Sequence, residues 1–220
     1  MKKSLLFAAL FAASLFTSAQ AQQNYRYVTP VNVVCKQFNL QILRDSAVSE
    51  TQYAAELNAL LKDLNDEKNE IDNCSKNLKY EKNLYSSMTD SYKTRKKQLA
   101  STQKNYEKDL KVYESLIKDV QKQMDIVRRM NSTDGSSVKD HSARLDRQQE
   151  QYKTEMKYIK SLLDELTKSS NTELNGTFTM LNDFLIELTD KETRLKNIIA
   201  QNKTNIEIVK TAQKSAKASK

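Results

Sequence analysis

The chain has 220 residues, with 36 lysines and arginines against 28 aspartates and glutamates, so its formal net charge is +8. Only two glycines and one proline occur in it, whereas average usage is roughly 7% and 5%. Because tight turns depend on glycine, proline, asparagine and aspartate, this composition argues against a loop-rich globular enzyme.

Residues 1–21 are typical of a secretory signal peptide. Lys2 and Lys3 precede an apolar run over residues 5–16, and a small-x-small motif predicts cleavage between Ala21 and Gln22. The apolar run is too short to span about 30 Å of hydrocarbon. We therefore expect an exported bacterial protein, periplasmic first and secreted as the alternative, with no transmembrane span after the signal is removed.

Residues 22–48 are predicted to form an extended or irregular segment, extended over residues 22–35 and undecided over residues 36–44. β-branched and aromatic residues, which favour extended structure, are concentrated between Tyr25 and Val34. Pro30 excludes a helix through that point, because proline lacks a backbone N–H and clashes with the preceding turn.

The first long helix is predicted over residues 49–130. Ser49 and Gln52 have the spacing of a capping box, and no glycine or proline follows before residue 131. A large apolar or aromatic residue recurs at every seventh position, which is the repeat of helices wound around each other. These seam positions of the first arm are Leu57, Leu64, Ile71, Leu78, Tyr85, Tyr92, Leu99, Tyr106, Tyr113, Val120 and Val127.

A cluster of turn-forming residues at 131–137 is predicted to be a hairpin tip, and a second helical arm follows over residues 138–209. The seam positions of this arm are Val138, Leu145, Tyr152, Ile159 and Leu166. Helices joined by a short loop lie antiparallel. The predicted fold is therefore all-α: a long antiparallel coiled-coil hairpin in which residues equidistant from Asp134 face each other.

Two features of the second arm leave alternatives open. The apolar repeat slips by one residue after Leu166, so an elongated three-helix bundle with a break near residues 169–176 is the alternative fold. Residues 210–220 carry lysines and no acid, and are predicted to be a basic disordered tail. These lysines are also a candidate contact for an anionic envelope surface: Lys210, Lys214, Lys217 and Lys220.

Polar residues occupy several facing positions of the seam. In the first arm they include Glu67, Cys74, Glu81 and Arg95. A strong two-stranded coil has apolar residues at both core positions. We therefore expect a thin seam that is either flexible or stabilised by a protein partner, which includes a second copy of the chain.

Cys35 and Cys74 are the only cysteines, and an even count in an exported chain favours a disulfide. An intrachain bridge requires residues 35–49 to run largely extended beside the first helix, because the two must cover the same distance. A bridge between two copies through Cys74 is the alternative.

No catalytic, cofactor-binding or metal-binding pattern occurs in the sequence. His141 is the only histidine, and no glycine-rich phosphate loop or metalloprotease motif is present. Export argues against nucleic acid as the partner of the positive charge. The sequence predicts a non-enzymatic coiled-coil protein that acts as a structural spacer, scaffold or protein-interaction module in the cell envelope. The alternative is a periplasmic holdase-type chaperone that binds unfolded envelope proteins.

Overall fold

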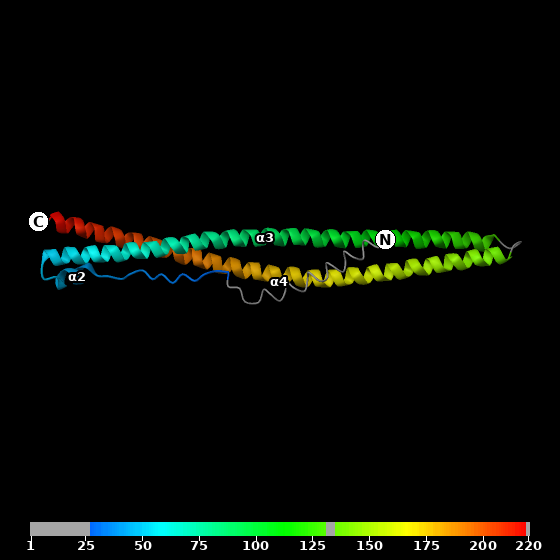
Figure 1. Ribbon diagram of the computed structural model, residues 1–220, viewed down its shortest axis with the longest axis horizontal. Coiled ribbons are helices and arrows are strands. Elements are labelled where there is room, and N and C mark those ends of the chain that lie inside the picture. Colours follow the sequence, from blue (N-terminus) through cyan, green and yellow to red (C-terminus); the bar gives the residue numbers. More distant parts are fainter. Residues whose placement is uncertain (1–26, 131–134, 219–220) are drawn as a thin grey trace. The chain divides into compact units, whose positions relative to one another are not determined.

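The computed structural model describes residues 27–130 and 135–218, and this part of the chain contains three helices and no β-strand. Helix α2 spans Leu40–Ser46, α3 spans Glu50–Arg129 and α4 spans Gly135–Ala218. Helices α3 and α4 pack against each other as an antiparallel hairpin (Figure 1). This confirms the all-α hairpin predicted from the heptad repeat. The predicted signal peptide with its Ala21–Gln22 cleavage site lies outside the described residues, as do positions 131–134 of the tip.

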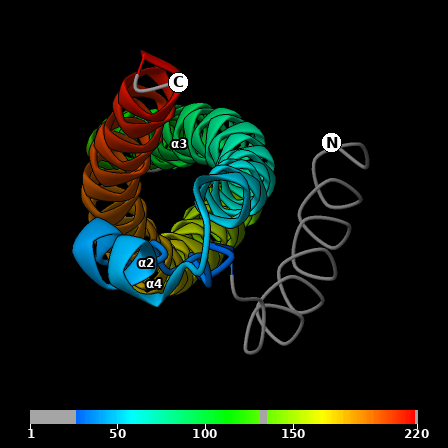
Figure 2. The same ribbon diagram turned by 90° about the vertical axis from the view of Figure 1, so that its left-hand side faces the viewer.

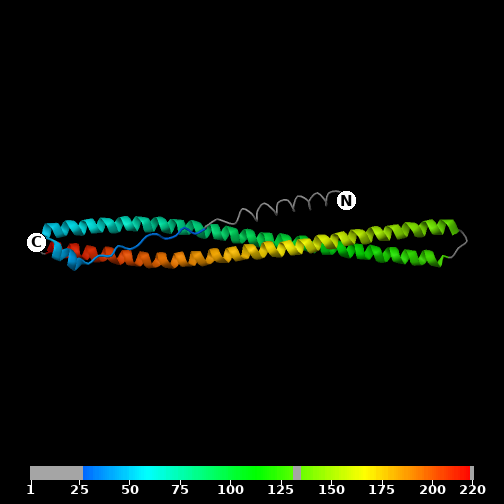
Figure 3. The same ribbon diagram turned by 90° about the horizontal axis from the view of Figure 1, so that it is seen from below.

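The chain divides into two compact units. The first unit contains residues 27–89 and 180–218 of the described part, and the second contains residues 90–130 and 135–179. In the first unit, residues 27–39, which we call the strap, run extended along α3 and α4 (Figure 3). The predicted extended N-terminal segment is therefore present, and it forms a third layer on the two helices.

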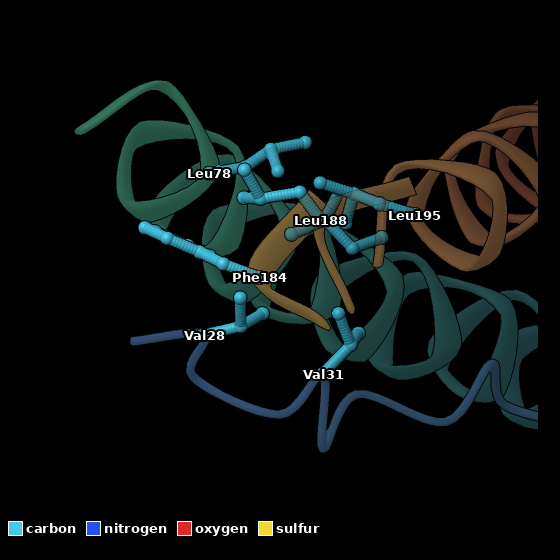
Figure 4. Close-up of a cluster of buried hydrophobic side chains, with 7 residues drawn as sticks. Val28, Val31, Leu78, Phe184, Leu188 and Leu195 are labelled. Carbon is cyan, nitrogen blue, oxygen red and sulfur yellow. The ribbon is translucent and has the colours of Figure 1, made fainter. Parts of the chain in front are cut away.

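Two apolar clusters hold the first unit together. One joins strap residues Val28 and Val31 to Ile71 and Leu78 of α3 and to Phe184, Leu188 and Leu195 of α4 (Figure 4). The other surrounds Tyr53, Leu57, Leu60, Leu64, Val209 and Ala216, and Leu40 and Leu43 of α2 pack against it. Figure 2 looks along the helices from the end where α2 lies.

The second unit has a smaller core. Val120, Met124 and Val127 of α3 meet Leu145 of α4, with Val138 and Tyr152 packed against them. The rings of Tyr113 and Tyr152 meet edge-on, with centroids 6.0 Å apart. Every predicted seam position of both arms is buried or half-buried. The half-buried ones are the tyrosines, Val138, Ile159 and Leu166.

The start of α3 has the expected cap. The Gln52 amide donates to Ser49 Oγ (3.1 Å), and Gln52 Oε1 accepts from the Val48 amide (3.0 Å). The first bond satisfies an amide that the first helical turn leaves free, and the second ties the residue before the cap to the helix.

Three predicted boundaries are wrong. Residues 22–48 include helix α2, because Asn39 Oδ1 caps it by accepting from the amides of Gln41 and Ile42. The predicted disordered tail is helical to Ala218, because Val209 and Ala216 are buried against α3. The second arm begins at Gly135 rather than at residue 138.

The alternative fold with a break near residues 169–176 is also wrong, because α4 is continuous through that region. The one-residue slip of the apolar repeat is absorbed within an unbroken helix. Gly176 lies inside this helix, and an added Cβ would meet nothing within 4 Å.

This continuity predicts the effect of replacing Gly176. Gly176→Ala should raise the free energy of unfolding by about 0.5–1 kcal/mol, because alanine loses less backbone entropy in a helix. Gly176→Pro should lower it by about 3 kcal/mol. Urea unfolding followed by circular dichroism at 222 nm measures both. A helix broken at this point would tolerate proline, and alanine would bring no gain.

Candidate functional site

Charged side chains enter the seam of α3 at every second heptad, at Glu67, Glu81 and Arg95. The intervening positions of the same line hold Cys74 and Met88, which pack with apolar residues. Each charged residue has a partner on α4. The positions that looked like weak layers in the sequence are therefore polar layers with defined partners.

The Glu81 layer is a buried ion pair completed by the strap. Lys191 Nζ donates to both carboxylate oxygens of Glu81, at 2.8 and 2.9 Å. The two side chains are 3% and 5% exposed. The backbone amide of Thr29 donates to Glu81 Oε1 at 2.8 Å. One carboxylate thus joins α3, α4 and the strap.

The Glu67 layer repeats this arrangement with a neutral partner. Asn202 Nδ2 donates to Glu67 Oε1 (2.8 Å) and to the Leu64 carbonyl (3.0 Å). The backbone amide of Lys36 donates to Glu67 Oε2 (2.8 Å), and the Lys36 carbonyl accepts from Asn205 Nδ2 (3.0 Å). The Lys36 side chain pairs with Asp63 at the surface.

The two anchor points have matching spacings on the strap and on α3. Glu81 and Glu67 are two heptads apart, which is about 21 Å of helix at 1.5 Å per residue. Thr29 and Lys36 are seven residues apart, and seven extended residues at about 3.2 Å each cover about 22 Å. The strap therefore spans the two carboxylates without slack when its backbone is extended.

In the second unit, Arg95 and Glu173 form the corresponding polar layer. Arg95 Nε donates to Glu173 Oε1 at 2.8 Å, and a second guanidinium nitrogen donates to Oε2 at 3.2 Å. The two residues are equidistant in sequence from Asp134, as the predicted register requires. A two-pronged contact of this kind fixes position as well as charge.

The predicted Cys35–Cys74 disulfide is not formed, and both thiols are free. The extended segment that the bridge requires is present, but its register separates the cysteines. Cys74 lies midway between Glu67 and Glu81, about 10 Å of helix from either, whereas Cys35 directly precedes the Lys36 anchor at Glu67. Cys35 Sγ donates to the Ile198 carbonyl instead (3.4 Å). Burial, with the Glu67 carboxylate beside it, raises the pKa of the Cys35 thiol to about 11.

Sequence reasoning found some of these residues and missed others. Glu67, Glu81 and Arg95 stood out as polar seam positions. Lys191 was missed, although it follows Phe184 by one heptad at a core position and so carried a detectable signal. The sequence held no signal for the roles of Thr29 and Lys36, because their backbone amides, which every residue except proline has, make the contacts.

The outer surface of α4 in the first unit carries exposed aliphatic side chains. Leu185 and Ile199 are 42% and 43% exposed and lie two heptads apart. Glu192 occupies the heptad position between them and pairs with Lys82 of α3 at 2.6 Å. Hydrogen bonds from Lys82 and Lys196 lower the pKa of the Glu192 carboxyl. We call Leu185 and Ile199 the flank stripe.

The described residues include no group of three or more His, Cys, Asp or Glu side chains placed to hold a metal ion. Among the described helices, none combines the length and the apolar character that crossing a membrane requires. Lys210, Lys214 and Lys217 are all exposed on the last turns of α4, whereas Lys220 lies outside the described residues. Comparisons with protein-family models, curated proteins and solved structures found no match to this chain.

The buried ion pair predicts that replacing a buried lysine costs much more unfolding free energy than replacing a surface lysine. Lys191→Met should cost about 3–5 kcal/mol of unfolding free energy, because it leaves the Glu81 carboxylate buried without its cation. Adding Glu81→Gln should recover part of this loss, since glutamine is neutral and still accepts from the Thr29 amide. Urea unfolding of the two single variants and the double variant measures the coupling.

Lys93→Met is the matched control, because Lys93 pairs with Asp90 at the surface, where the side chains are 64% and 72% exposed. Such pairs contribute at most about 1 kcal/mol. An equal cost for Lys93→Met and Lys191→Met would contradict the role given to the buried pair.

The Cys35 environment predicts slow alkylation in the folded protein. In a Cys74→Ser variant at pH 8, iodoacetamide should react with Cys35 about 100-fold more slowly than with a cysteine of pKa 9.0, because the thiolate is the nucleophile. The rate should rise with pH up to about 11 and become ordinary in urea. The folded state favours the neutral thiol, so this contribution to stability is present below pH 9.0 and lost as the pH rises through about 11.

Proposed function

We propose that this chain is an exported, non-enzymatic coiled-coil protein that acts as a structural spacer, scaffold or protein-interaction module in the bacterial cell envelope. The flank stripe is the observation that carries this proposal. Exposed aliphatic side chains two heptads apart on one line of the helix, outside the seam, suit contact with a further helix. The Lys82–Glu192 pair lies between them and supplies polar contacts of the kind that protein interfaces also contain.

The buried polar groups support a structural rather than a chemical role for the seam. Glu81, Lys191 and Glu67 each have partners on another element, and those partners fix the register of the helices and the strap. Carboxylates that hold register are not available to a substrate. The surface of the helices is then the part of the molecule that meets other molecules.

A photo-crosslinking amino acid in the native host tests this proposal. Placed at Leu185 or Ile199, it should give one defined product in the envelope fraction. The control positions Ile186 and Ile208, which are 59% and 43% exposed on the same helix outside the stripe, should give little of it. Equal products at all four positions, or none, would contradict an interaction through the stripe.

Export has its own measurement. The protein isolated from the envelope fraction should begin at Gln22 when its N-terminus is sequenced, because cleavage follows Ala21. A protein that starts at Met1 and stays in the cytoplasm would exclude the envelope.

A periplasmic holdase-type chaperone is the second candidate, and the lysines of the last turns of α4 favour it. Lys210, Lys214 and Lys217 follow helical spacing, so they lie near one face, where they could attract acidic clients or an anionic envelope surface. A holdase should suppress aggregation of an unfolded outer-membrane protein, and salt should weaken the effect. A scaffold should leave aggregation unchanged.

A further inference from the structure

We propose that the groove between α3 and α4 in the first unit binds an extended polypeptide segment of a partner protein, and that the chain's own strap is the resting occupant of this groove. The inference rests on the proposed role as an interaction module, and it names the kind of partner. It concerns a different surface from the flank stripe.

The groove recognises its occupant through the backbone. Thr29 and Lys36 donate their amides to Glu81 and Glu67, while the side chains of both residues are exposed. An amide is present at every residue except proline. These two anchors therefore select an extended conformation over seven residues and leave the side chains at the anchors unspecified.

The side chains of the strap that enter the groove include two valines and the ring of Tyr27, which stacks on Phe184 with centroids 4.9 Å apart. Val28 and Val31 are 6% and 5% exposed against Leu188, Phe184 and Leu78 (Figure 4). Val34 points outward and is 84% exposed. A foreign segment with β-branched residues at the two valine positions and an aromatic residue at the Tyr27 position meets the same requirements.

The groove keeps its polar framework when the strap leaves. Glu81 retains Lys191 and Glu67 retains Asn202, so each carboxylate loses one hydrogen bond and keeps its partner on α4. The strap continues into α2, in which no residue is fully buried, although Leu40 and Leu43 pack against the second apolar cluster. The two carboxylates therefore have partners on α4 that do not depend on the strap, and a partner segment would replace the two amides and the apolar contacts of the strap.

A labelled peptide of residues 27–38 tests the proposal by fluorescence anisotropy with the full chain. The tethered strap competes at high effective concentration, so the unmodified protein should bind the peptide weakly. Val31→Asp in the protein should weaken its own strap and raise the affinity for the peptide at least tenfold. Val34→Asp is the matched control and should leave the affinity unchanged.

Peptide variants separate backbone from side-chain recognition. A peptide with Thr29→Ala and Lys36→Ala keeps both amides and should bind the Val31→Asp protein within about threefold of the parent peptide. A peptide with Thr29→Pro and Lys36→Pro loses both donors and should bind at least tenfold more weakly. An unrelated segment of alternating valine and threonine, with an aromatic residue at the Tyr27 position, should bind as well.

Three outcomes overturn the proposal. The Val31→Asp and Val34→Asp proteins could bind the peptide equally well, or the proline peptide could bind as tightly as the parent peptide. In the third outcome the strap peptide binds and the unrelated segment does not, which would limit the groove to exchange between copies of the chain. If circular dichroism shows that the Val31→Asp protein does not fold, the Thr29→Pro protein takes its place in the experiment, because it lacks one of the two strap anchors. Peptide binding can fail while crosslinking at the flank stripe succeeds, so the two proposals are tested separately.

Discussion

The buried carboxylate of Glu81 is the constraint on which the first unit depends. It is almost inaccessible to water, so its charge must be balanced within the protein. Lys191 from α4 and the Thr29 amide from the strap meet it at once. Leucine layers alone would tolerate a shift of α3 against α4 by one heptad, because the repeat is the same in each. A buried ion pair does not tolerate that shift, since it would leave two charges unpaired in an apolar seam.

The alternation of charged and uncharged layers extends this argument along α3. Glu67, Glu81 and Arg95 recur every two heptads, with Cys74 and Met88 between them. The charged layers specify which residues face each other, and the apolar layers provide burial. The seam contains few layers that are apolar on both helices, yet the polar layers define which residues of α3 and α4 pair. Because two of these carboxylates also accept strap amides, docking of the strap and pairing of the helices in the first unit stabilise each other.

The heptad repeat, the capping box and the scarcity of glycine were sufficient to predict the hairpin, since it depends on local periodicity. The pairing of Arg95 with Glu173 follows the register centred on Asp134, but the pair itself was not predicted. Helix α2 was missed because its cap is one asparagine and its apolar face is two leucines. The helical end of α4 beyond residue 209 was missed because the lysine content hid the burial of Ala216. The predicted disulfide is absent because of the register of the strap. The sequence indicates that Cys35 can reach α3, but the hydrogen bond from the Lys36 amide to Glu67 places Cys35 beside Glu67, one heptad away from Cys74.

The hydrogen bonds to Glu81 and Glu67 also limit the binding free energy that a partner segment could gain in the groove. An incoming chain would offer Glu81 and Glu67 the amides that the strap offers, so these hydrogen bonds cancel in the exchange. The difference in free energy then lies in the inward side chains, opposed by the entropy of bringing two molecules together. Such an exchange favours modest affinity and broad sequence tolerance. A groove of this kind suits a module that holds many extended segments briefly, whereas the flank stripe, with fixed aliphatic positions, suits one defined helical partner.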